Sequence, residues 1–537
     1  MLKRVAAALA VLLICPLTSS AVSNDDFFQF KRAQRRIKCA GAKNSVTEYN
    51  QRLNWPDQTN NGDENLYPDL RGSFGKTLSH FGSGYIRPEA FNSLVKAIQS
   101  GNPSDFDTIE MGEGIVKLVS PQASAAFSLS CNDSWCNDIP PAPAFASAQT
   151  AAEMVEVYWA ALCRDIPFNE FSASAAVASA ITDLNTMSDF RGPKFGGAVT
   201  PATFLRGSTP GDLAGPYISQ FLYQTIPFGS TSIPPEQTVP LPGAGNDFNT
   251  SSSDWFTVVN GGQTGSAISF DNSPRFIRTP RDLAEYVHVD TPGQAALGAA
   301  LILASYGPSA LDPANPYLNN PTQSGFVTFG ISQVLELIRE ATHEALKAAW
   351  YHKWEVNRRL RPEEYGFYVQ EQIVKGTPLG ISPELINSTA LANIFAAFGT
   401  YFVPTAYPEG CPAHPAYPAG HAAFIGAGVT ILKAYFNENF QIPDPLEPDA
   451  ANTNLVAYPG PLTVGGELNK LAANISLGRD LAGVHYRSDG YYGMLLGEKV
   501  AIDVLNNQSF LFKENFEGYT LTKFDGTTIT VGQKRTP

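Results

Sequence analysis

The segment CPAHPAYPAGHAAFIGAG, residues 411–428, joins a proline-rich loop to the start of an apolar helix. Its prolines restrict the loop, Gly420 allows a close approach of the backbone, and the pattern predicts a helix that begins at His421. Backbone N–H groups at a helix N-terminus lack partners within the helix and bind anions. The segment therefore predicts an anion site, although a capped proline-rich turn would show the same pattern.

Two further segments gather cationic side chains. YHKWEVNRRLRPEE, residues 351–364, brings four of them to the end of a predicted long helix that Pro362 helps to terminate: Lys353, Arg358, Arg359 and Arg361. Cations also stabilise the C-terminus of any helix, so this segment alone does not require a ligand.

The third segment is SLGRDLAGVHYRSDGYYG, residues 476–493, which carries Arg479, His485, Arg487 and Asp489. His485 and Asp489 are four residues apart, so on a helix they share one face and the carboxylate can orient the imidazole. A surface ion pair would have the same spacing.

The overall charge decides what these cations can bind. The 537 residues include 37 Lys and Arg against 50 Asp and Glu, a formal net charge of -13, which disfavours a general affinity for nucleic acid or anionic lipid. Cations that converge in an acidic protein instead indicate one small, phosphate-like oxyanion. The alternative is a divalent metal site, which the neighbouring Lys and Arg would disfavour, with these ligands: His414, His421, His485 and Asp489.

The spacing of apolar residues predicts a mainly α fold with few short strands. Helices are expected at residues 89–99, 148–163, 175–186, 280–306, 329–360, 421–436, 466–477 and 490–506, and a terminal hairpin at residues 520–531. We expect a helical and loop-rich N-terminal region at residues 22–280 and a helical bundle at residues 281–537 that carries the site. The two are expected to form one globular unit.

The first 21 residues, MLKRVAAALAVLLICPLTSSA, combine a basic start, an apolar run and a small-residue end. This pattern predicts a signal peptide at residues 1–21 and a secreted protein. The apolar run of about 13 residues is too short to cross a bilayer, so no membrane span is expected.

Taken together, the three segments form one signature: Lys353, seven residues, Arg361-Pro362; Pro418-Ala419-Gly420-His421; Arg479, five residues, His485, three residues, Asp489. This signature resembles the superfamily of vanadium-dependent haloperoxidases and type 2 acid and lipid phosphatases. The seven-residue gap and His414 are similar to its algal and cyanobacterial bromoperoxidase branch, and residues 61–80, 204–229 and 275–290 extend the likeness over most of the chain. The resemblance implies the helical-bundle fold of that superfamily.

The resemblance also implies a vanadate cofactor, with His485 Nε2 bonded to vanadium and the other groups around its oxygens: Lys353, Arg361, Arg479 and the Gly420 N–H. His421 is then the acid and base, Lys353 polarises the reacting oxygen, Asp489 orients His485, and Trp350 and His414 line the halide pocket. The implied reaction uses hydrogen peroxide to oxidise bromide and iodide to hypohalous acid, which halogenates an organic acceptor. A homo-oligomer is also implied, and calcium is left open, without a motif to support it.

One residue departs from the family pattern. Ala419 stands where the family commonly has Ser, so a hydroxyl donor to the cofactor is missing. We therefore expect oxidation of bromide and iodide, and chloride least readily. The rival enzyme is a secreted acid phosphatase, with His485 as the phosphoryl-accepting nucleophile and His421 as the general acid. A non-catalytic oxyanion-binding protein is the third hypothesis, and it leaves the pairing of His421 with His485 unexplained.

Overall fold

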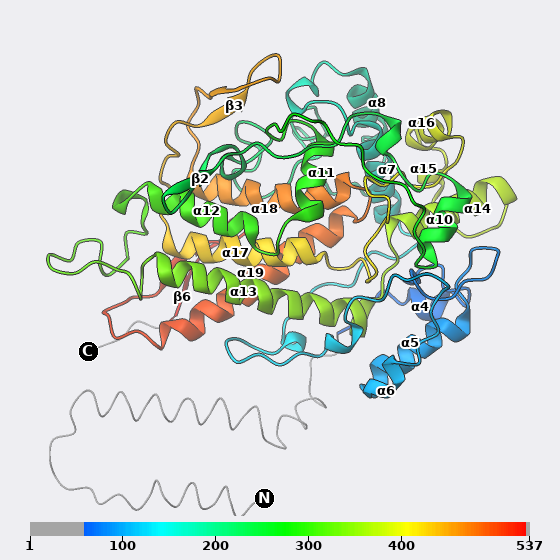
Figure 1. Ribbon diagram of the computed structural model, residues 1–537, viewed down its shortest axis with the longest axis horizontal. Coiled ribbons are helices and arrows are strands. Elements are labelled where there is room, and N and C mark those ends of the chain that lie inside the picture. Colours follow the sequence, from blue (N-terminus) through cyan, green and yellow to red (C-terminus); the bar gives the residue numbers. More distant parts are fainter. Residues whose placement is uncertain (1–57, 533–537) are drawn as a thin grey trace, which may run out of the picture. The chain divides into compact units, whose positions relative to one another are not determined.

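The computed structural model describes residues 58–532, which are mainly helical (Figure 1). The helices of the first half are α4 Asp63–Leu66, α5 Pro88–Ser100, α6 Pro103–Phe106, α7 Ala148–Leu162, α8 Ala175–Leu184, α9 Gln220–Tyr223, α10 Ser252–Val259, α11 Pro280–Val289 and α12 Gln294–Ser305. Those of the second half are α13 Ile331–Tyr351, α14 Pro362–Lys375, α15 Pro383–Ile386, α16 Thr389–Phe398, α17 Gly420–Tyr435, α18 Val464–Leu481 and α19 Arg487–Ser509.

Strands are few and short in this part of the chain. They form antiparallel pairs: β1 Ile226–Phe228 with β2 Thr231–Ile233, β3 Leu446–Pro448 with β4 Leu455–Ala457, and β5 Tyr519–Thr522 with β6 Thr528–Val531. The last pair is the predicted terminal hairpin. The predicted mainly α fold with few strands is therefore confirmed.

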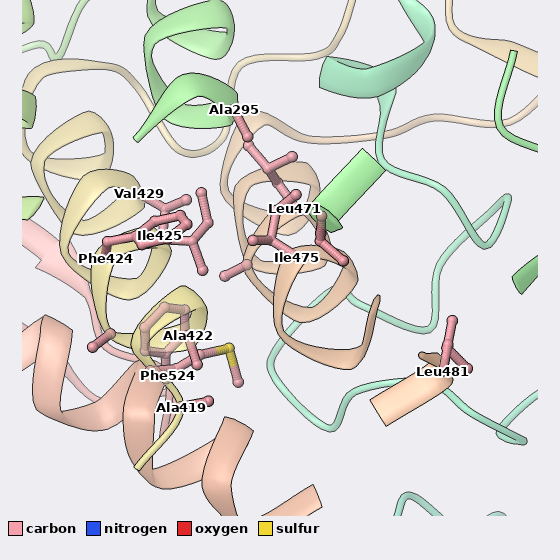
Figure 2. Close-up of a cluster of buried hydrophobic side chains, with 14 of the residues drawn as sticks. Ala295, Ala419, Ala422, Phe424, Ile425, Val429, Leu471, Ile475, Leu481 and Phe524 are labelled. Carbon is pink, nitrogen blue, oxygen red and sulfur yellow. The ribbon is translucent and has the colours of Figure 1, made fainter. Parts of the chain in front are cut away.

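Helix α17 lies at the centre of the bundle, where it packs against α13, α18 and α19 (Figure 1). All of its residues are buried except His421, as expected of a helix that is apolar on every side. Figure 2 shows Ile425 and Val429 of α17 beside Leu471 and Ile475 of α18. The buried bundle thus fixes the N-terminus of α17, where the predicted site begins.

Glycines let α17 and α19 approach closely. A Cβ at Gly426 would come within 2.5 Å of the Met494 carbonyl oxygen, and one at Gly497 within 2.1 Å of the Ala423 carbonyl oxygen. Both distances are shorter than any van der Waals contact, so larger residues at these positions would force the two helices apart.

Elements on both sides of residue 280 pack together. Helices α7 and α9 of the first half both contact α18 of the second. No helix of residues 58–532 is both long and apolar enough to cross a bilayer. The predicted leader, residues 1–21, lies outside the described residues.

The helix predicted at residues 280–306 is wrong as a single element. It is two helices, α11 and α12, separated by Asp290-Thr291-Pro292-Gly293. Pro292 disfavours a helical conformation at the residue before it, and Gly293 adopts a left-handed φ of 86° at the N-cap of α12. The break leaves Asp290 outside the helices.

The prediction for residues 329–360 is also wrong at its end. The α-helix α13 ends at Tyr351 and continues as a π-helical segment, His352–Asn357 (η7), after which Arg358 adopts a left-handed φ of 39°. Pro362 does not terminate this helix. It occupies the first turn of α14, where its missing N–H costs nothing.

Candidate active site

His485 is oriented by Asp489, as the four-residue spacing predicts, but not across a helix face. His485 directly precedes Tyr486, the N-cap residue of α19, and Asp489 lies in the first turn of that helix. The Asp489 carboxylate accepts hydrogen bonds from His485 Nδ1 at 2.8 Å and from the Tyr486 N–H at 3.1 Å. With its proton on Nδ1, the imidazole leaves the lone pair of Nε2 available.

Arg361 bridges two of the histidines of the site, His485 and His414. Its Nη1 donates to His485 Nε2 at 2.9 Å and its Nη2 to His414 Nδ1 at 2.9 Å. Burial, and then the charges of Arg361 and Lys353, hold the pKa of His485 well below its ordinary value. His485 is therefore a neutral imidazole at physiological pH, with its lone pair directed at a cation.

Lys353 and Arg479 complete a cluster of buried cations. Lys353 lies on the π-helical segment, and its Nζ donates to the carbonyls of Pro415 and Ala416 at 2.6 and 3.0 Å. Arg479, near the end of α18, donates through Nη1 to the Val287 carbonyl at 2.7 Å, while its buried Nε has no partner among the described residues. Both cations therefore retain N–H donors that can bind a ligand.

Pairing with carboxylates separates the predicted cations into two groups. The paired ones are Arg358 with Glu64, Arg359 with Asp489 and Glu153, and Arg487 with Glu156. Among residues 58–532, no carboxylate lies within ion-pair distance of the others: Lys353, Arg361 and Arg479. Buried cations are normally paired, so the unpaired group requires an anion.

The pKa of Lys353 also reflects the excess of positive charge in this cluster. Burial, and then the charges of Arg361 and Arg479, lower it well below the ordinary value of a lysine, and the attraction of Asp489 does not compensate. An anion bound among these groups would favour the charged lysine. The cluster is therefore built for an oxyanion, and the residues fit vanadate or phosphate.

The first backbone N–H groups of α17 are hydrogen-bonded to no acceptor of the described residues. No hydrogen bond to the backbone N–H of Gly420 or His421 is found within residues 58–532. A Cβ at Gly420 would lie 3.3 Å from the Trp350 ring, which makes this a tight position. These N–H groups supply the helix-end anion site that the sequence predicts.

Ala419 is the N-cap residue of α17 and provides no side-chain cap. An Ala419→Ser variant should stabilise the protein by about 1 kcal/mol, because a serine hydroxyl can accept from a free N–H of the first turn. Urea unfolding monitored by circular dichroism measures this change. The Ala419→Cys variant, whose thiol is close to serine in shape but is a weak acceptor, is the matched control, and an unchanged unfolding midpoint for Ala419→Ser would contradict the capping argument.

His421 has a partner that the sequence did not reveal. Its Nε2 lies 2.9 Å from the buried Asp290 carboxylate, which follows the end of α11. Burial, and then the charge of Arg479, lower the pKa of His421, and the hydrogen bond to Asp290 opposes this shift. His421 is 24% exposed, so it is the member of the cluster that can exchange protons with solvent.

Trp350 and His414, the residues predicted to line a halide pocket, lie side by side. Their ring centroids are 4.8 Å apart, and Lys353 Nζ lies 5.9 Å from the Trp350 ring. The Trp350 Nε1 donates to the Val119 carbonyl at 3.1 Å. The two rings therefore form an aromatic surface next to the ammonium group of Lys353.

A second carboxylate supports Asp489 from behind. Glu153 of α7 accepts from Arg359 Nη2 at 3.2 Å and from Ser488 Oγ at 2.8 Å, and Arg359 Nη1 donates to Asp489 at 2.8 Å. Arg359, one of the cations at the end of the predicted long helix, therefore lies in a network that supports Asp489.

The alternative of a divalent metal site finds no support here. Among the described residues, no three His, Cys, Asp or Glu side chains are grouped so that they could hold a metal ion. Arg361 lies between His414 and His485 and donates to both, which excludes a cation from that position.

Known proteins resemble this chain in sequence and structure. Residues 333–514 match the family model described as the VCPO second helical-bundle domain. The chain is 33% identical to a vanadium-dependent bromoperoxidase of Corallina pilulifera over 88% of this chain and 94% of that protein, and 33% identical to one of Ascophyllum nodosum over 89% and 90%. A solved homohexameric structure, the second vanadate-dependent bromoperoxidase of Ascophyllum nodosum, aligns with a TM-score of 0.87 and 28% identity over 98% of this chain and 96% of its own.

Proposed function

The chain belongs to the family of vanadium-dependent bromoperoxidases, and on this premise we propose that the cluster around His485 holds vanadate and uses it to oxidise bromide and iodide. The protein is a vanadate-dependent haloperoxidase. The observation that supports this use of the cluster is its three buried cations, which pair with no carboxylate of residues 58–532 and lie next to a neutral imidazole whose Nε2 accepts a hydrogen bond from Arg361.

Each cofactor-directed residue has a role that follows from its contacts. His485 Nε2 binds vanadium, because Asp489 holds the proton on the other ring nitrogen. The oxygens of vanadate are held by Lys353, Arg361, Arg479 and the Gly420 N–H. These donors already surround the position before the ligand arrives, and only the hydrogen bond from Arg361 Nη1 to His485 Nε2 must break when that nitrogen binds vanadium.

Bound vanadate supplies the Lewis acid that activates hydrogen peroxide toward halide. His421 moves the protons of this exchange, since it is partly exposed and its depressed pKa keeps it neutral and able to accept. Asp290 fixes the orientation of its ring. Lys353 would donate a hydrogen bond to an oxygen of the bound group.

The halide approaches along Trp350 and His414, beside Lys353. Iodide is oxidised more easily than bromide, and chloride least easily. The hypohalous acid then halogenates an organic acceptor.

We propose a homo-oligomeric assembly and secretion, each supported by a separate observation. The solved Ascophyllum nodosum relative is described as homohexameric, which supports a homo-oligomer for this chain. The basic, apolar and small-residue pattern of residues 1–21 supports removal of a signal peptide and secretion.

Halogenation of a phenol-type indicator dye tests the function directly. Vanadate added to metal-free enzyme should restore peroxide-dependent activity with bromide and with iodide, because the buried cations and His485 then hold the cofactor that activates peroxide. Excess phosphate should block the restoration, since it competes for the same cations. The rates with iodide, bromide and chloride give the halide order.

The rival phosphatase makes the opposite prediction in the same samples. If vanadate-loaded protein oxidises neither bromide nor iodide but hydrolyses a phosphate ester, the peroxidase assignment is wrong. The Lys353→Met variant is a useful companion, because it keeps the size of the side chain and removes its charge.

A further inference from the structure

Tyr407 contacts two cationic side chains, one of which belongs to the candidate active site. The guanidinium of Arg479 lies 5.2 Å from the centre of the Tyr407 ring, and the His288 ring stacks on it with centroids 3.9 Å apart. The phenol oxygen accepts from Arg479 Nη1 at 3.2 Å and donates to the Ala284 carbonyl at 2.6 Å. Tyr407 is buried, so these contacts fix one side of Arg479.

The end of α11 also holds the active-site groups. The Val287 carbonyl accepts from Arg479 Nη1 at 2.7 Å, and Asp290 contacts His421 at 2.9 Å. His288 lies between these two residues in the chain. A shift of this short segment would therefore move a cofactor-binding cation and the proposed acid and base together.

His288 ties this segment to the loop that carries Tyr407. Its Nε2 lies 2.7 Å from Glu409 Oε1, and its Nδ1 lies 3.4 Å from Glu285 Oε2. Burial alone would lower the pKa of His288, but the hydrogen bonds and charges of these two carboxylates outweigh it and raise the pKa to about 9. The imidazolium is thus the form present at neutral pH.

The surroundings of His288 contain few other titratable groups. Glu285 is on its own helix, Glu409 and Tyr407 come from the facing loop, and Arg479 of α18 lies on Tyr407. The loop is held independently by Lys76, whose Nζ donates to the Glu409 carbonyl at 2.7 Å.

We propose that His288 is a positioning residue for Arg479: paired with Glu409 and stacked on Tyr407, it fixes the ring and the helix end against which Arg479 rests, and thereby raises the affinity of the site for its oxyanion. The proposal rests on the proposed function only for the identity of that oxyanion. It assigns a role in cofactor binding to a histidine that no active-site motif of the sequence includes.

The test compares vanadate binding by calorimetry in wild type, His288→Gln and Glu409→Gln. The Glu409 side chain is 50% exposed, so its replacement should not disturb folding. In both variants the dissociation constant at pH 7.5 should rise about tenfold, a size typical of residues that orient cofactor-binding groups. Because wild-type His288 loses its charge as the pH passes about 9, the ratio of variant to wild-type constants should shrink toward one by a pH of about 10.

His343, an exposed histidine of α13, provides the matched control, and His343→Gln should bind vanadate as wild type does. Wild-type affinity in both His288→Gln and Glu409→Gln at pH 7.5 would overturn the proposal, and so would an equal weakening at every pH, which indicates a packing defect. The same series with inorganic phosphate tests the positioning role even if wild type fails to bind vanadate, an outcome that would count against the proposed function alone.

Discussion

The His485→Ala variant should lose vanadate binding almost completely, with a dissociation constant at least about 100-fold above that of the wild type. Alanine removes the His485 nitrogen lone pair that would bind vanadium, while Lys353, Arg361 and Arg479 remain as an electrostatic site only. The variant should also lose the stabilisation that bound vanadate gives, which is about 2.7 kcal/mol when the ligand is present at 100 times its dissociation constant. Calorimetric titration and thermal unfolding with and without vanadate measure both effects.

His343→Ala is the control for the loss of a histidine, since His343 is exposed on α13. It should show the full vanadate-induced rise in unfolding temperature. If His485→Ala shows that rise as well, His485 does not bind the metal, and the site assignment must change.

The His421→Ala variant should separate binding from turnover. His421 contributes a proton carrier rather than a charge, because its pKa is depressed by burial and by Arg479. Vanadate affinity should therefore change little, whereas bromide oxidation at saturating vanadate should fall by about 10²–10⁴-fold, the usual contribution of a general acid or base.

Asp290→Asn is the companion variant, because asparagine keeps the size of the partner but accepts a hydrogen bond less strongly. It should lie between wild type and His421→Ala in turnover number. A His421→Ala enzyme with a normal turnover number would exclude His421 as the proton carrier, whatever its affinity for vanadate.

The sequence predicted the parts of the site that short motifs encode. Three segments meet around the N-termini of α17 and α19. Together they contain the predicted cofactor-binding residues Lys353, Arg361, Gly420, Arg479 and His485. Their local spacing also reflects real hydrogen bonds, such as that from His485 to Asp489. Periodicity located the central helices because α13, α17, α18 and α19 are long and bury most of their residues.

The missed residues share a different property. Asp290 lies 131 positions from His421, and Glu153 lies 206 positions from Arg359. Such pairs form only when the bundle folds, so no local pattern marks them. The errors in helix boundaries have local causes. Proline ends a preceding helix but is also favoured in the first turn of the next one, and Pro362 takes the second of these positions.

The three buried cations also shape how the protein becomes active. A site with this much uncompensated positive charge binds any oxyanion of suitable shape, and phosphate matches the same donors. Activation of the enzyme is then the replacement of one bound anion by another, and not the binding of vanadate to an empty site. The time needed to activate a fresh preparation would depend on how fast the first occupant leaves, and a preparation purified in phosphate buffer would start more slowly than one purified without it.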